Sequence, residues 1–425
     1  MMKRLLKIIS SQDVAPLRRD PVDPATLSKA AELVSAVQAG GLEALRDLSL
    51  RFGDLADEES PLFYGKEALK EALDSLDENR RAILERTAAR IDAFARAQRD
   101  CIKELEMPIP GGKAGHRIIP VERAGCYAPG GRFPLPSSVL MTAVTARAAG
   151  VKEVYLASPK PTKETLAAAA IAGVDGVLAA GGAQAIAALA YGVEGLPPCD
   201  AVVGPGNRWV TAAKQLVSGF VRIDMLAGPS ELVILADKSA KPGVVAADLL
   251  AQAEHDVDAL PVLVTTSEEL LASLEEELGR QLDSLSTHET AREALRNGYA
   301  VLVNSLEEGV EICNRLAPEH LEVLTENADE VSKGLVHFGG LFIGENAAEV
   351  LGDYGAGPNH TLPTGGTARS QAGLSVFNFL RVATWMRIDN RAEAQDLIED
   401  AVGLGEMEGL EGHAKSAAAR RQSTT

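Results

Sequence analysis

The first candidate for chemistry is a histidine at the end of an expected helix. His255 closes the segment VVAADLLAQAEH, and Gln252 precedes it by three residues. Residues three apart lie on one helical face, so the amide and the imidazole could form half of a metal site. Polar residues at helix ends are also common without a ligand, so a structural role remains an alternative.

A second group lies in a segment rich in glycine and proline. The sequence GDYGAGPNHTLPTGGTAR contains Asp353 and, seven residues later, His360. Ordered irregular loops of this kind often hold ligands, although Asp353 could instead cap a turn. Near the C-terminus, His413 follows Glu408 by five residues, and an ordinary surface position on a helix is the alternative there.

These segments together supply nitrogen and oxygen donors without a thiolate, from Gln252, His255, Asp353 and His413. Such a mixture suits Zn²⁺, and also Mn²⁺ or Co²⁺. Spacing alone does not establish the site. Of the other four histidines, we expect structural roles for three, which are His116, His288 and His337.

An adjacent Glu–His pair is the candidate for proton transfer. Glu319 and His320 lie in RLAPEHLEV, directly after Pro318, which restricts the backbone of Ala317. Histidine titrates near neutral pH and is the usual general base, and a neighbouring carboxylate could activate water. A helix cap is the alternative interpretation.

Three glycine-containing loops that follow expected strands are candidates for a cofactor site. They are GCYAPGG (125–131), GGAQ (181–184) and GPGN (204–207). The last is nearest to the dinucleotide fingerprint GxGxxG but lacks its third glycine, so the motif signal is weak. All three would lie at the carboxyl edge of one parallel sheet, where open α/β folds bind ligands.

Alternating strands and helices must position these groups. Short apolar strands alternate with small-residue helices over residues 117–237, and the pattern continues from 238 to about 380. Such alternation predicts an α/β fold with parallel sheets and crossover helices. The spacing of apolar residues over 25–107 predicts helices. No repeat of fixed period is visible, but the two alternating blocks could be related sheets.

Composition excludes several classes of protein. The 425 residues are 46% hydrophobic and 24% charged, which is typical of a folded globular protein. A net charge of −18 disfavours nucleic acid and anionic membranes as partners, and 4% aromatic residues argue against a base-stacking surface. The apolar segment 176–193 approaches transmembrane length, but Gly181-Gly182 should divide it into a buried strand and a buried helix.

The four cysteines bear on the compartment. They are far apart and form no CxxC motif, which predicts neither a disulfide framework nor a thiolate zinc site. The N-terminus lacks the apolar stretch of a secretion signal. We therefore expect a cytoplasmic protein.

Several segments, taken in order, strongly resemble the histidinol dehydrogenase family. They span nearly the whole chain, and their joint occurrence is highly specific. The matching segments are ERAGCYAPGGRFPLPSSVLM, AGGAQAIAALAYG, VVGPGNRWVTAAKQ, DMLAGPSELVILAD, DLLAQAEHD, APEHLE, GDYGAGPNHTLPTGGTAR and EGLEGHA.

The resemblance implies a role for each matching residue. The implied ligands of one Zn²⁺ per subunit are Gln252, His255, Asp353 and His413. The implied catalytic pair is Glu319 and His320, and the implied NAD contacts are Tyr127, Gln184 and Asn207. The implied substrate-binding residues are Ser230, Gln252, His255, Glu319, His320, Asp353, His360, Glu408 and His413.

The resemblance also implies two incomplete Rossmann-like domains with parallel sheets, plus small N- and C-terminal helical segments. We expect a first α/β domain that carries the metal and catalytic residues, and a second that carries the NAD-binding loops. The expected boundaries are an N-terminal arm at 1–24, the first domain at 25–119 and 238–380, the second at 120–237, and a helical dimerisation segment at 381–425. The implied homodimer would supply Glu408 and His413 in trans.

The implied reaction is the oxidation of L-histidinol to L-histidine through an aldehyde, with two NAD⁺, in the last steps of histidine biosynthesis. On this interpretation the metal would ligate substrate nitrogens and fix their orientation. His320 would be the base of both oxidations, and Glu319 would activate water for attack on the aldehyde.

Three alternatives stay open at this point. A related dehydrogenase could act on another alcohol such as a sulfonated diol, although the carboxylate of Glu408 suits a cation and repels a sulfonate. A metal hydrolase could use Glu319 or His320, but the GGAQ and GPGN loops have no role in hydrolysis. A non-catalytic binding protein would not need the intact pair and all four ligands.

Overall fold

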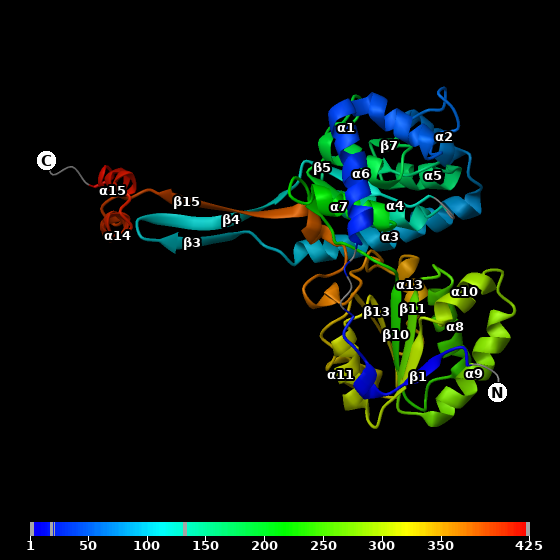
Figure 1. Cartoon of the computed structure of the whole chain (residues 1–425). Helices are drawn as coiled ribbons and strands as arrows, with labels where there is room; N and C mark the ends of the chain where they lie inside the picture. The colour runs from blue at the N-terminus through cyan, green and yellow to red at the C-terminus, as the bar shows by residue number, and fades with distance from the viewer. Residues whose placement is uncertain (1–3, 18–19, 21, 131–133, 422–425) are drawn as a thin grey trace.

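A six-stranded parallel sheet forms one domain of the computed structural model (Figure 1), which describes residues 4–17, 20, 22–130 and 134–421. Its strand order is β1-β12-β11-β10-β13-β14. The strands are β1 (Lys7–Ile9), β10 (Glu231–Ala236), β11 (Leu260–Thr265), β12 (Tyr299–Leu302), β13 (His320–Leu324) and β14 (Gly340–Ile343). The central strands β10, β11 and β13 are buried along their whole length, which explains apolar runs such as LPVLVT.

Helices cover both faces of this sheet. One layer is α8 (Pro242–Ala253), α9 (Glu268–Leu282) and α10 (His288–Leu295). The opposite layer is α11 (Leu306–Leu316) with α12 (Ala328–Ser332). A short helix, α13 (Glu349–Asp353), follows β14 along the chain and contacts α8.

A second sheet forms the other domain and has the order β2-β7-β6-β5-β8-β9. Its strands are β2 (Phe63–Tyr64), β5 (Arg123–Tyr127), β6 (Glu153–Ala157), β7 (Gly176–Leu178), β8 (Ala201–Val203) and β9 (Arg222–Ile223). Only β2 runs antiparallel among them. Its helices are α4 (Pro136–Ala149), α5 (Lys163–Ile171), α6 (Gly182–Tyr191) and α7 (Arg208–Val217).

Five parallel strands of each sheet follow the same order. In chain order they lie third-second-first-fourth-fifth, as β7-β6-β5-β8-β9 and as β12-β11-β10-β13-β14. The expected pair of incomplete Rossmann-like domains is therefore confirmed. In each sheet the order in which strands are added reverses between the first and fourth strands, and that switch point is where open α/β sheets bind ligands.

The placement of the N-terminal helices corrects an expectation. These helices are α1 (Pro24–Arg51), α2 (Lys66–Asp74) and α3 (Glu78–Asp100). α1 packs on α6 and α7, α2 packs on α5, and α3 packs on α4. In addition, β2 pairs with β7. This region therefore belongs with residues 120–237. Their apolar faces show that the helices are buried but do not identify the sheet that they cover. The expected N-terminal arm likewise contributes β1 to the other sheet.

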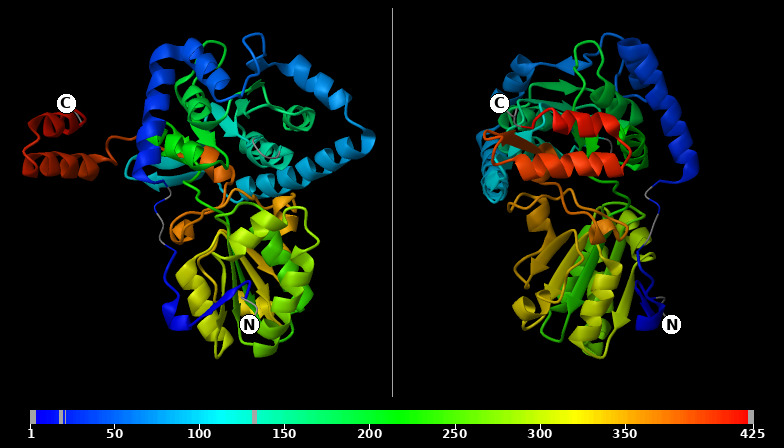
Figure 2. Two further views of the ribbon diagram at one scale, coloured as in Figure 1. Left: turned by 45° about the vertical axis from the view of Figure 1, so that its right-hand side comes forward. Right: turned by 90° about the vertical axis from the view of Figure 1, so that its left-hand side faces the viewer.

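A projecting arm is the second departure from the expected boundaries. Its antiparallel sheet has the order β15-β4-β3, with β3 (Leu105–Ile109), β4 (Gly112–Pro120) and β15 (Leu380–Ile388). At its far end lie α14 (Gln395–Met407) and α15 (Glu411–Ala418), away from both large sheets (Figures 1 and 2). Residues 381–388 are therefore a strand and not a helix. Residues 422–425 of the expected segment lie outside the described residues.

The long apolar segment 176–193 is divided as expected, into β7 and α6, and both are largely buried. Within the described residues, no helix combines the length and the apolar character needed to cross a membrane.

Candidate active site

The Glu319–His320 pair lies at the amino end of β13. Ala317 adopts a left-handed backbone conformation (φ 51°) after α11, and Pro318 leads the chain into the strand. Both side chains of the pair are buried. The alternative of a helix cap is therefore wrong, because His320 begins a strand that pairs with β10.

The first residue of β10 fixes both side chains. The backbone N–H of Glu231 donates to Glu319 Oε2 at 2.9 Å, and His320 Nδ1 lies 3.1 Å from the carbonyl oxygen of Glu231. A carbonyl oxygen only accepts, so Nδ1 carries the hydrogen of this bond. His320 Nε2 is buried and has no hydrogen-bond partner among the described residues, which leaves this nitrogen able to take a proton.

Three carboxyl groups, two of them from α13, surround this imidazole. Glu349 Oε1 lies 3.6 Å from His320 Nδ1, and Asp353 Oδ1 lies 3.7 Å from Nε2. Burial lowers the pKa of His320, but the charges of Glu349, Glu319 and Asp353 outweigh it and raise that pKa well above its ordinary value. Burial raises the pKa of Glu319 to about 8. The pair therefore consists of two groups whose proton affinities are strongly changed by their surroundings.

Three of the four expected metal ligands come from neighbouring elements. Gln252 lies in the last turn of α8 and is fully buried, and His255 lies just beyond the helix end rather than on it. Gln252 Nε2 nevertheless lies 3.4 Å from His255 Nδ1. Asp353 ends α13. Burial raises its pKa, but hydrogen bonding and charge interaction with His320, with smaller effects of His360 and His255, outweigh burial and lower the pKa.

The donor set fits a metal ion. Gln252 Oε1 is buried without a hydrogen-bond partner in the described structure, which is costly unless a ligand or a cation satisfies it. An amide oxygen, an imidazole and a carboxylate are donors that suit Zn²⁺. A second grouping shares only Asp353 with this set, since His320, Glu349 and Asp353 offer ligand atoms within 4.8 Å of one another.

The arm separates the remaining two residues from the rest. Glu408 follows α14 and His413 lies in α15, and both are exposed at the far end of the arm (Figure 2). The structure of one chain therefore does not bring them to Gln252, His255 and Asp353.

His360 connects the two domains. Its Nδ1 donates to the carbonyl oxygen of Asp353 at 3.0 Å, and its Nε2 lies 3.2 Å from the hydroxyl oxygen of Ser138 on α4. Burial lowers the pKa of His360. The neighbouring Asn359 donates to the carbonyl oxygen of Met141 at 2.8 Å. The glycine-rich loop thus holds the two domains together at the site instead of only covering it.

The expected cofactor loops lie at the carboxyl edge of the second sheet. Tyr127 ends β5, and its hydroxyl accepts from the N–H of Gly182 at 3.3 Å. Gln184 is buried in the first turn of α6. Asn207 caps α7, where its Oδ1 accepts from the N–H of Trp209 at 3.0 Å. Gly131 of the first loop lies outside the described residues.

Two of these loops flank the switch point of their sheet. One loop follows β5, and the other, 204–207, follows β8. These two strands are adjacent, and the strand order of the sheet reverses between them. Gly204 donates to Asp224 Oδ2 at 2.7 Å, and Lys214 donates to the carbonyl oxygen of Gly204 at 2.9 Å. Lys214 and Asp224 also form a buried ion pair with each other, so the two side chains together fix the loop. The position suits a dinucleotide.

The catalytic pair faces the same boundary. Ile223 ends β9 at the carboxyl edge of one sheet, and eight residues later Glu231 begins β10 at the amino edge of the other. Ser230, an expected substrate contact, is half-buried in this linker. The N–H of Gly365, in the glycine-rich loop, donates to Glu231 Oε1 at 3.0 Å.

Several buried or half-buried acidic residues were not expected from the sequence. They are Glu231, Glu322 and Glu349 around the catalytic pair, Asp248 on α8, and Asp54 beside Gln184. A signal existed for Glu231 and Glu322, because each interrupts an otherwise apolar buried strand. Asp248 likewise interrupts an apolar run, VVAADLLA, whereas Glu349 and Asp54 carry no comparable signal.

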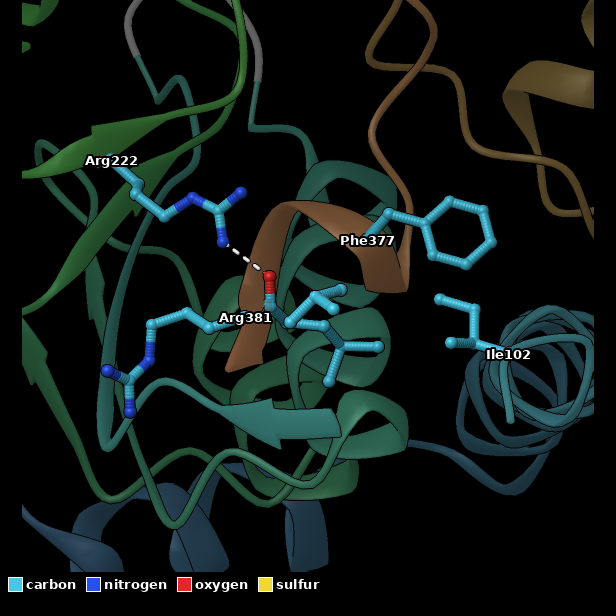
Figure 3. Close-up of a pocket in the computed structure, with 6 residues that line it drawn as sticks. Ile102, Arg222, Phe377 and Arg381 are labelled. Atoms are coloured by element: carbon cyan, nitrogen blue, oxygen red, sulfur yellow. Dashed lines mark hydrogen bonds between the residues drawn. The ribbon is translucent and has the colours of Figure 1, made fainter. Parts of the chain in front are cut away.

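A separate cavity of about 490 Å³ lies at the base of the arm (Figure 3). Its lining residues are Ile102, Arg222, Phe377, Leu380, Arg381 and Val382. Arg222 already donates to the carbonyl oxygen of Leu380. None of the expected site residues lines it, so we do not associate it with the chemistry.

Comparisons with known proteins agree with this fold. A family model described as histidinol dehydrogenase matches residues 18–421. A histidinol dehydrogenase from Thermus thermophilus is 46% identical over 94% of this chain and 95% of its own length, and one from Methanocaldococcus jannaschii is 38% identical over 91% and 90%. The crystal structure of histidinol dehydrogenase from Elizabethkingia anophelis superimposes with a TM-score of 0.90 at 29% identity, over 99% of each chain.

Proposed function

The chain belongs to the histidinol dehydrogenase family, and from this premise we propose that it oxidises L-histidinol to L-histidine with two NAD⁺ and one bound Zn²⁺. One observation supports the proposal most strongly. Glu319 and His320 are both held on the backbone of Glu231, at the edge of the sheet that faces the other domain. A proton acceptor and a carboxylate are thereby fixed where two domains meet.

His320 is the proposed base for the alcohol. Its Nδ1 hydrogen is committed to a carbonyl oxygen, so the imidazole in its neutral form presents the lone pair of Nε2. Because the surrounding carboxylates raise the pKa of His320, the fraction of the protein in this form grows as the pH rises. Accepting the hydroxyl proton there produces an imidazolium, which the carboxylates of Glu349 and Asp353 stabilise. Once that proton has passed to solvent, the same nitrogen accepts the proton of the aldehyde hydrate in the second oxidation.

Glu319 is the proposed activator of water. One of its oxygens is held by the N–H of Glu231, so the carboxyl group cannot turn freely. Burial raises its pKa to about 8, which makes its carboxylate a stronger base than an exposed glutamate. It removes a proton from the water that attacks the aldehyde carbon.

Bound groups complete the proposal. In one chain the metal would be held by Gln252, His255 and Asp353. The cofactor would be contacted by Tyr127, Gln184 and Asn207. Bound NAD⁺ would supply the hydride acceptor for each oxidation, and a bound metal ion would orient the substrate through its nitrogens. Ser230 and His360 are proposed substrate contacts, since both lie where the two domains meet.

A homodimer is part of the proposal. The arm exposes large apolar side chains, including Val382, Met386, Leu404 and Met407, of which Met386 is 71% and Met407 81% exposed. A second copy would remove these side chains from water. The same contact would carry Glu408 and His413 to the partner's Gln252, His255 and Asp353, where an exposed histidine becomes the fourth ligand.

A cytoplasmic location is also proposed. The four cysteines, Cys101, Cys126, Cys199 and Cys313, are free, and all but Cys101 are buried. Free thiols of this kind suit a reducing compartment.

Substrate-dependent NADH formation tests the function. Purified protein with Zn²⁺ and NAD⁺ is supplied with L-histidinol, or with a sulfonated diol as the competing alcohol, and NADH absorbance is followed. We expect NADH with histidinol only, and its loss in His320→Asn. Oxidation of the diol with no response to histidinol would assign a different substrate, and undiminished turnover in His320→Asn would remove the proposed base.

A further inference from the structure

Asp54 lies beside two residues of the expected cofactor site. It precedes β2 in the segment that follows α1, far in sequence from the loop that it contacts. Its Oδ2 accepts from the N–H of Gly181 at 2.8 Å and from Nε2 of Gln184 at 3.0 Å. Burial raises the pKa of Asp54, and these two hydrogen bonds oppose that shift.

A carboxylate in this position decides which way the Gln184 amide points. An ionised carboxylate only accepts hydrogen bonds, so the NH₂ group of the amide must face it. The carbonyl oxygen of Gln184 must then point away from Asp54. Gln184 is almost fully buried in the first turn of α6, so its surroundings restrict it to this arrangement.

The same contact changes what the start of α6 can bind. Helix N-termini attract anions such as phosphate through their free N–H groups. Here the N–H of Gly181 is taken by Asp54 and the N–H of Gly182 by the Tyr127 hydroxyl. A second anion beside the Asp54 carboxylate would be repelled. A neutral donor, such as a ribose hydroxyl or a carboxamide N–H, would find the carbonyl oxygen of Gln184.

We propose that Asp54 is a positioning residue of the NAD⁺ site, which orients the Gln184 amide so that its oxygen accepts a hydrogen bond from a neutral donor of the cofactor. This inference rests on the proposed function, because it requires that the chain binds NAD⁺. Asp54 itself does not touch the cofactor.

A double-mutant cycle on NAD⁺ binding tests the inference. The dissociation constant of NAD⁺ is measured by titration calorimetry for wild type, Asp54→Ala, Gln184→Ala and the double variant, each with Zn²⁺ present. We expect Asp54→Ala to weaken binding about tenfold, the loss of one well-oriented hydrogen bond. Because Asp54 acts through Gln184, the double variant should bind no more weakly than Gln184→Ala, within about twofold.

Two further variants separate orientation from stability. Asp54→Asn can place an oxygen at the position of Oδ2 and should keep NAD⁺ affinity within about twofold. Asp77→Ala is the control for stability. Like Asp54, Asp77 accepts a hydrogen bond from a backbone N–H at the start of a helix, in this case that of Arg80 in α3 at 2.9 Å. This variant should lower the melting temperature by an amount similar to Asp54→Ala while leaving NAD⁺ affinity unchanged.

The outcomes are distinct. Unchanged affinity in Asp54→Ala, additive losses in the double variant, or a tenfold loss in Asp54→Asn would each overturn the inference. The last measurement stays decisive if Asp54→Ala fails to fold. The Michaelis constant for histidinol should not change in Asp54→Ala. Absence of NAD⁺ binding by the wild-type protein would instead contradict the proposed function.

Discussion

At the residue level, His320 is held in one tautomer by a neighbouring strand. The carbonyl oxygen of Glu231 takes the Nδ1 hydrogen, and Nε2 is left buried without a hydrogen-bond partner in the described chain. A buried nitrogen in this state destabilises the protein unless it serves a ligand. This feature is the physical basis for assigning proton transfer to His320.

The metal site gives a prediction about His255. His255→Asn removes an imidazole donor from the proposed site, so the zinc content of the purified protein should fall well below one per chain. His288→Asn, at an exposed position on α10, should retain full zinc content. Elemental analysis after dialysis measures both variants. Full zinc occupancy in His255→Asn would exclude this histidine as a ligand.

A buried carboxyl pair gives a prediction about pH. Burial raises the pKa of Glu322 to about 8 and that of Asp248 to about 6, whereas both groups titrate near pH 4 when unfolded. Between these values the folded protein binds more protons than the unfolded chain, so the free energy of unfolding falls as the pH rises through this window.

Glu322→Gln should therefore reduce the loss of stability at high pH. Between about pH 6 and about pH 9, the melting temperature of the variant should fall by at least about 2 °C less than that of wild type. Differential scanning fluorimetry checks this, with the exposed Glu326→Gln as the control. Parallel curves for wild type and Glu322→Gln would contradict the assigned burial effect.

At the level of elements, strand ends and the loops after them build the site. The catalytic pair begins β13, Tyr127 ends β5, and the loop 204–207 follows β8. Gly204 is the most constrained of these positions, with φ of 126° and the carbonyl oxygen of Tyr127 only 2.1 Å from where a Cβ would lie.

Gly204→Ala should disturb the cofactor loop. The added methyl group must displace Tyr127 or the loop, so we expect a melting temperature lower by several degrees and weaker NAD⁺ binding. Gly219→Ala is the matched control, because no atom lies within 4 Å of its added Cβ. Equal melting temperatures for the two variants would show that the close approach at Gly204 is tolerated.

Sequence patterns singled out residues that neighbouring elements of the structure carry, but they did not give the domain boundaries. Gln252, His255, Glu319, His320 and Asp353 have side chains that stand out by type, and short segments hold them. Glu349 and Asp54 could not be found in this way, because their roles depend on distances between segments far apart in sequence. The carboxylate of Asp54, for example, contacts an amide 130 residues away.

The arm shows the same limit for secondary structure. β15 pairs with β4, about 270 residues earlier in the chain, and neither strand alternates apolar and polar residues in a regular way. Hydrophobic periodicity identifies elements that cover a core, and this arm covers none within its own chain. The expected helix over 381–388 was wrong for this reason.

At the level of the whole molecule, the arm separates Glu408 and His413 from the other site residues. The proposed dimer makes a prediction that a monomeric enzyme would not meet. Glu319→Gln and His413→Asn protomers should each be nearly inactive alone. Mixed dimers formed by co-expression contain one intact site each, so random pairing should restore about a quarter of wild-type activity.

A second mixture controls for this recovery. Glu319→Gln and His320→Asn both change the site within their own chain, outside the arm. Their mixed dimers therefore contain no intact site and should stay inactive. Steady-state NADH formation measures both mixtures. No recovery in the first mixture would contradict the contribution of His413 in trans.

The stoichiometry of NAD⁺ reduction tests the central claim most directly. A limiting, known amount of L-histidinol is consumed to completion with excess NAD⁺, and NADH and L-histidine are both quantified. The account predicts two NADH and one histidine per histidinol, because His320 serves two successive oxidations and Glu319 supplies the water between them. One NADH per histidinol with accumulation of the aldehyde would contradict it.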